Sequence, residues 1–153
     1  SLEILSSTTN ASCRRCPIRL RKISGVGALT ALSFLLIIGD PKRIKNSRSV
    51  GSYLGLTPMR DQSGDCDKQL RISKAGNTYL RRLLVGASQY VLGKFGQECE
   101  LRSRGLRLAE RGGPRAKKKA VIATARKLAT IMHSILLNES DYIAQAAQPP
   151  QAA

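Results

Sequence analysis

The chain has 153 residues and carries 26 Lys and Arg against 10 Asp and Glu, for a net charge of +16. This length suits one domain with a real core, and the charge favours an anionic partner, above all a nucleic acid. Aromatic residues make up 4% and Trp is absent, which disfavours base-stacking surfaces of the RNA-recognition type. No apolar run approaches the ~20 residues that span a bilayer, so we expect a soluble cytoplasmic protein with no membrane partner.

The first residues predict little structure before a basic helix. Residues 1–12 are polar, with no initiating Met and no signal-peptide pattern, which indicates a fragment or a processed product. Residues 14–23 predict a short basic helix despite Pro17. We therefore expect 1–19 to be an N-terminal segment, partly disordered or the end of a preceding helix, and 20–142 to be the domain.

A glycine hairpin follows this helix. Gly25, Val26 and Gly27 lead into an apolar helix predicted over 28–38. The glycines permit positive φ and let the backbone approach a ligand closely, while free N–H groups at the helix start favour an anion. The pattern predicts a helix-hairpin-helix whose residues Gly25, Val26 and Gly27 bind nucleic acid. A plain turn between two packed helices is the alternative.

The middle of the chain is predicted to be irregular. Residues 39–41 end the apolar helix, and Ser47 is expected to cap a third helix through Leu54. The stretch from Pro58 to Gly76 is too hydrophilic for core and too long for a simple connection, so it predicts a functional or disordered loop, with room for a short β-hairpin.

Helical patterns return after this loop. A helix beginning at Asn77 has Leu80 and Leu84 on its apolar face and arginines turned away from it. Residues 102–119 are rich in Lys and Arg with Glu110 as their one acid, which predicts a basic linker that stays open until a polyanion binds. A last core helix is expected over 115–137. The fold class is therefore all-α, a helix-hairpin-helix followed by a long loop and two longer helices, with a disordered tail at 143–153.

The metal-ligand pattern is weak. Cys13 and Cys16 form a Cys-x-x-Cys, but Cys66 and Cys99 are widely separated and His133 is the only histidine. We expect reduced cysteines rather than structural zinc, and no metal site in this chain. His133 is interpreted as a packing residue.

Several short motifs occur in a fixed order along the chain. They are Ile-Ser-Gly-Val-Gly-Ala-Leu-Thr-Ala (23–31), Ile-Gly-Asp-Pro (38–41), Tyr-Leu-Gly-Leu-Thr-Pro (53–58), Gln-Ser-Gly (62–64) and Ile-Ser-Lys-Ala-Gly-Asn-Thr-Tyr-Leu-Arg-Arg-Leu-Leu (72–84). In order and spacing, the stretch from Leu20 to Tyr142 resembles the C-terminal domain of bacterial insertion-sequence family 110 (116/110/902-type) transposases. The Lys-Lys-Ala-Val-Ile-Ala-Thr-Ala-Arg-Lys-Leu helix (118–128) belongs to the same resemblance.

The resemblance implies a DNA recombinase with a two-part active site. An N-terminal RuvC-like domain would hold Mg²⁺ on four acidic residues, and the C-terminal domain would supply a serine that becomes covalently attached to DNA. The matching serine here is Ser63, followed by Gly64. The family further implies DNA and a structured guide RNA as partners, a homo-oligomer in the full-length protein, and a bacterial cytoplasmic, nucleoid-associated location.

The chemistry at Ser63 agrees with its surroundings in part. A serine nucleophile needs an adjustable loop, an activating metal or base, and cations that stabilise the transition state. Asp65, Cys66 and Asp67 depart from the basic and glycine residues usual in the family, and acids beside this serine are unfavourable unless a metal neutralises them. An ordinary Ser-Gly turn is the alternative for Ser63. Asp61, Asp65 and Asp67 could form a metal cluster, but clustered acids in a polar loop are usually solvated, and that is the interpretation we favour.

Cations near this loop and in the basic stretch are the expected nucleic-acid contacts. These contacts are Arg71, Lys74, Asn77, Arg81, Arg82, Arg115, Lys117 and Lys118. For the adjacent Arg81 and Arg82, the solvated face of an amphipathic helix is the alternative. For the whole chain, the rival hypotheses are a non-catalytic helix-hairpin-helix binding module, an inactive transposase remnant, and a ribosomal-type RNA-binding protein.

Overall fold

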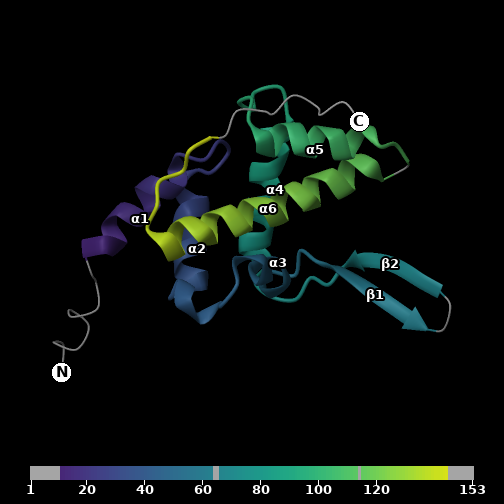
Figure 1. Ribbon diagram of the computed structural model, residues 1–153, viewed down its shortest axis with the longest axis horizontal. Helices are drawn as coiled ribbons and strands as arrows, with labels where there is room; N and C mark the ends of the chain where they lie inside the picture. Colours follow the sequence, from purple (N-terminus) through teal and green to yellow (C-terminus); the bar gives the residue numbers. More distant parts are fainter. Residues whose placement is uncertain (1–10, 64–65, 114, 145–153) are drawn as a thin grey trace.

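The computed structural model describes residues 11–63, 66–113 and 115–144, which form a helical body with one projecting β-hairpin (Figure 1). The hairpin lies within the predicted 58–76 loop, and the mostly helical fold confirms the expected class. The elements in chain order are α1 (Ala11–Arg21), α2 (Ala28–Ile38), the 3₁₀ turns η1 (Pro41–Arg43) and η2 (Ser47–Ser49), α3 (Val50–Tyr53), β1 (Pro58–Ser63), β2 (Cys66–Ile72), α4 (Thr78–Leu92), α5 (Glu100–Glu110) and α6 (Ala116–Asn138).

The long helix α6 runs through the middle of the body and contacts α1, α3, α4 and α5 (Figure 1). Ala125, Leu128 and Met132 recur at helical spacing on its buried face and are fully buried, so the predicted core helix is confirmed. Among the described helices, α6 alone is long and apolar enough to cross a membrane, yet half of that stretch is buried inside this fold. Core helices of soluble proteins pass the same test.

Helix α2 begins and ends as its sequence predicts. Gly39 follows it with φ +64 and donates its N–H to the Leu35 carbonyl at 2.9 Å, which is a conformation that glycine adopts without a Cβ penalty. One face of α2 packs into the core through Ala31, Phe34 and Ile38. Its other face leaves Leu29, Leu32 and Leu36 exposed.

The third helix differs from the prediction that Ser47 caps it. Asn46 occupies the cap of the 3₁₀ turn η2, and its side-chain oxygen accepts the Arg48 N–H at 3.0 Å. The Ser47 hydroxyl is instead engaged with His133 Nδ1 at 2.9 Å. Asn is as good a capping residue as Ser. With Asn46 as the cap, the Ser47 hydroxyl links η2 to α6 through His133.

The predicted open linker over 102–119 is wrong, because most of it is helical. Leu101 and Gly105 of α5 are buried, and this spacing of one helical turn places both on the side that faces the body. A Cβ at Gly105 would lie 2.6 Å from Thr124 Oγ1 of α6. Glycine therefore lets the two helices cross closely, and this packing outweighs the repulsion among the basic side chains.

Candidate nucleic-acid interface

The β-hairpin is an arm that extends away from the helical body (Figure 1). β1 and β2 pair antiparallel with Pro58 opposite Ile72 and Ser63 opposite Cys66, with an irregularity between Pro58 and Arg60. Ser63 is therefore the last residue of β1, at the tip of the arm. Gly64 and Asp65 lie outside the described residues, as do the side chains of residues 60–70.

The base of the arm is a close crossing of two backbone segments. The Ser73 N–H donates to the Thr57 carbonyl at 2.9 Å, and the Lys74 N–H donates to the Gly55 carbonyl at 3.1 Å. Gly55 has φ +68, and a Cβ there would lie 2.5 Å from the Ala75 nitrogen. A Cβ at Gly76 (φ +86) would overlap the Tyr53 carbonyl oxygen in the same way. Both glycines are thus required for the two segments to touch.

Arg81 locks this crossing from below, and its predicted place on the solvent face of the helix is wrong. Its side chain is buried, 8% exposed. Nη1 donates to the carbonyls of Leu54 (3.2 Å), Lys74 (3.2 Å) and Ala75 (3.3 Å), and Nη2 donates to Thr78 Oγ1 at 3.2 Å. A guanidinium offers several donors in a rigid fork, so one residue joins the end of α3 to the start of α4. Arg81 therefore stabilises the base of the arm, and its guanidinium donors are engaged in these hydrogen bonds.

Asn77 likewise has a structural partner. Its side-chain oxygen accepts the Leu80 N–H at 2.9 Å and caps α4. The other cations predicted near the arm, Arg71, Lys74 and Arg82, are exposed. Lys74 has φ +55, a left-handed conformation uncommon for lysine. Their role in binding nucleic acid stays a prediction.

The glycine hairpin between α1 and α2 differs in part from its predicted geometry. Gly25 has φ +85, as expected, but its close approach is to α4, where a Cβ would lie 2.8 Å from the Ala87 carbonyl oxygen. Gly27 has φ −82 and extended backbone, which any residue adopts. Val26 is buried at 6% exposure. The hairpin therefore packs α1 and α2 against α4. Contact between its backbone N–H groups and a phosphate stays a prediction.

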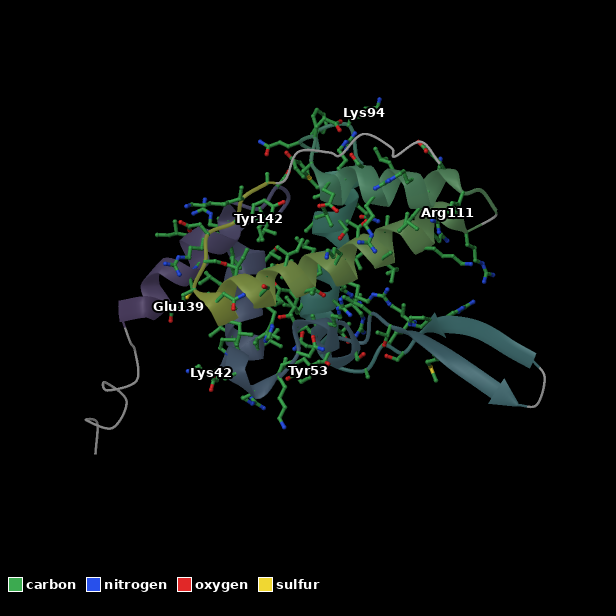
Figure 2. The ribbon with its side chains drawn as sticks, viewed as in Figure 1. Lys42, Tyr53, Lys94, Arg111, Glu139 and Tyr142 are labelled. Atoms are coloured by element: carbon green, nitrogen blue, oxygen red, sulfur yellow. The ribbon has the colours of Figure 1, made fainter. Side chains whose placement is uncertain are left out.

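The far end of the α5–α6 pair carries the densest exposed charge. Its exposed cations are Arg107, Arg111, Arg115, Lys117, Lys118 and Lys119. Arg111 lies at the outer end of these helices (Figure 2), which extend toward the same end of the long axis as the arm (Figure 1). Arg102 is different, because it donates to the carbonyls of Val91 and Gly93 at 2.6 and 2.5 Å and so closes the end of α4.

Two basic residues that the sequence reasoning missed, Arg126 and Lys127, are exposed on α6. They interrupt the apolar pattern of the core helix as an adjacent pair. That interruption was the available signal for a charged surface on this helix.

The described side chains show no group of three or more His, Cys, Asp or Glu that could hold a metal ion. Cys99 is a free thiol, and Cys13 and Cys66 have side chains outside the described set. His133 is fully buried, with Nε2 2.8 Å from the Pro41 carbonyl and Nδ1 2.9 Å from Ser47 Oγ. Because a carbonyl only accepts, Nε2 carries the proton. The interpretation of His133 as a packing residue is confirmed.

The chain belongs to the family described as Transposase IS116/IS110/IS902, whose model matches residues 18–103. It is 34% identical over 87% of its length to a Coxiella burnetii protein named transposase for insertion sequence element IS1111A. It is 31% identical over 81% to a probable family 20 transposase of Pseudomonas aeruginosa, and 32% identical over 76% to the pilin gene-inverting protein of Moraxella lacunata. The chain spans about a third of these relatives, 35%, 36% and 35% of their lengths.

Proposed function

We propose that this chain is the strand-exchange segment of an insertion-sequence transposase, in which Ser63 attacks a DNA phosphodiester and the helical body binds nucleic acid. The observation that carries the proposal is the place of Ser63 in a family member, at the end of β1 on a projecting arm. A nucleophile there can reach a strand that the body holds, while the arm base fixed by Arg81 limits its movement.

The proposed step conserves the energy of the phosphodiester. Ser63 Oγ forms a bond to phosphorus, the bond from phosphorus to the departing strand oxygen breaks, and the serine proton leaves to a base. A serine hydroxyl is a weak nucleophile at neutral pH, so the step needs an activating base or metal and cations that stabilise the charge developing on the phosphoryl oxygens. Exposed Arg71 and Lys74 lie at the base of the arm, away from Ser63 at its tip, so we propose that they contact neighbouring phosphates of the same strand.

The Mg²⁺ implied by the family resemblance does not fit the described side chains of this segment, which offer no cluster of ligands. It is proposed to bind in another part of the full-length protein. Consistent with that division, purified residues 1–153 should bind nucleic acid without exchanging strands. A guide RNA, assembly of two or more subunits and a cytoplasmic, nucleoid-associated location are proposed on the resemblance alone.

The test uses the whole protein encoded by the reading frame that contains this chain. Ser63→Ala should abolish the covalent protein–DNA adduct on a denaturing gel and leave DNA affinity unchanged, because the change removes one oxygen from the arm tip. Ser52→Ala, on the exposed surface of α3, is the matched control and should form the adduct normally. An adduct that persists in Ser63→Ala would refute the nucleophile.

The rival functions give different results. A non-catalytic helix-hairpin-helix module or an inactive remnant would form no adduct as Ser63→Ala or as Ser52→Ala, and both variants would keep their affinity for DNA. A ribosomal-type RNA-binding protein would prefer RNA over duplex DNA at physiological salt.

A further inference from the structure

A basic groove of about 430 Å³ runs between α5, α6 and η2 and reaches Thr57 at the base of the arm. Its cations are Arg48, Arg104, Arg126 and Lys127, and no acidic residue lines it. These four residues are the groove cations. They come from segments almost 80 residues apart in sequence, and the fold brings them to one cavity.

The helix packing that shapes this groove depends on two glycines. A Cβ at Gly51 of α3 would lie 2.5 Å from Arg126 Cγ, so glycine lets the arginine stem rest on α3. Gly105 of α5 similarly allows the close crossing with Thr124 of α6. Long basic side chains often bury their stems while the charged heads remain in solvent. Here that packing restricts where the Arg126 head can lie.

The charge of the groove has no counterion within the described part of the chain. None of the groove cations forms an ion pair with a described acid. Like charges that share one cavity repel each other unless an anion lies between them.

We infer that this groove binds the phosphodiester backbone of a nucleic acid, with the groove cations contacting phosphate oxygens. A phosphate seated in the groove neutralises charges that form no ion pair with a described acid. The inference deepens the proposed function and rests on it in taking nucleic acid as the partner. Because Thr57 leads directly into β1, a strand in the groove lies next to the base of the arm that carries Ser63.

The test measures how binding depends on salt. The 153-residue chain is titrated against a labelled duplex DNA of about 20 base pairs and a stem-loop RNA of similar size, between about 50 and 200 mM salt. Removing two phosphate contacts with the double variant R104Q/K127Q should lower the slope of log K against log salt by about 1.8 on duplex DNA, at about 0.9 per contact. Affinity should fall roughly tenfold or more.

The control variant K42Q/K94Q removes the same charge from exposed sites outside the groove (Figure 2). If binding is confined to the groove, the slope of log K against log salt for this control should change by less than about half of the change expected for one lost contact. If R104Q/K127Q fails to fold by circular dichroism, R48Q on the exposed turn η2 gives the single-contact version, with a slope decrease of about 0.9.

The outcomes separate the two proposals. A loss specific to the groove variants supports the inference, and the nucleic acid with the larger change identifies the strand that the groove holds. Equal losses in both variants, or no loss in either, overturn the groove while nucleic-acid binding stands. A wild-type chain that binds neither DNA nor RNA overturns the proposed function and the groove with it.

Discussion

Arg81 provides the sharpest test of how the arm is held. Its guanidinium donates to the carbonyls of Leu54, Lys74 and Ala75 and to the Thr78 hydroxyl. Arg81→Met keeps much of the side-chain stem and removes every one of these donors. The change leaves the buried Leu54 carbonyl without this partner, and it separates the two segments at the base of the arm from the helix below them.

The expected loss follows from the burial of each bond. A hydrogen bond from a charged donor contributes about 1.5–3 kcal/mol, so we assign about 2 kcal/mol to the buried bond. The three part-buried bonds are 3.2–3.3 Å long and open to water, and together they add about 1 kcal/mol. A total of about 3 kcal/mol predicts a Tm lower by roughly 6–12 °C for a chain of this size.

Urea unfolding followed by circular dichroism measures this loss. Arg82→Met is the matched control, because Arg82 is the exposed neighbour on the same helix and should change stability by less than about 0.5 kcal/mol. A structural Arg81 predicts reduced stability, with nucleic-acid affinity retained at temperatures where the variant is folded. Unchanged stability with weakened affinity would instead make Arg81 a phosphate ligand and refute the argument.

Three further predictions follow from other contacts. Gly25→Ala should destabilise the fold by about 2 kcal/mol or more in urea unfolding, because the left-handed φ is strained for alanine and its Cβ meets α4, whereas Gly27→Ala should cost less than about 1 kcal/mol. Burial, with Cys99 and Glu100 adding to it, raises the pKa of Tyr142 above its usual 10.0. The contribution of Tyr142 to stability is therefore full below pH 10 and is lost as pH rises through the raised value. Tyr142→Phe should remove a component above pH 10 from the tyrosinate absorbance titration. Nucleic-acid affinity of the wild-type chain should fall steeply with salt, and a flat response would contradict binding through phosphates.

Helices whose ends or apolar faces are marked in the local sequence could be predicted. α2 is bounded by the Gly25–Gly27 turn and by Gly39, and α6 is marked by its apolar periodicity, so both helices were expected close to their observed bounds. The α5 helix was missed because its high charge density masked the apolar positions Leu101 and Gly105. Charge indicates what a surface can bind, and it does not prevent a helix from packing through its other face.

The candidate site depended on contacts that no local pattern contains. Gly55 and Gly76 look like ordinary turn residues in the sequence, and only the fold shows that each is needed where backbone segments cross. The Arg81–Arg82 pair looks like one exposed basic patch, but α4 buries the first and exposes the second. The groove cations come from three separate segments, so their convergence follows from tertiary packing.

The arm and the groove together predict that two different phosphates are engaged. β1 has six residues, and at about 3.3 Å per residue Ser63 lies roughly 20 Å from Thr57 at the groove. Along a duplex that follows the arm, at about 3.4 Å per base-pair step, this distance is about six base pairs.

Ethylation of individual phosphates in DNA bound by the whole transposase should therefore weaken binding at a position about six base pairs from the site of the Ser63 adduct. R104Q/K127Q should lose this interference while still forming the adduct at the same nucleotide. Interference confined to the attacked phosphate would mean that the groove and Ser63 do not share one DNA strand path.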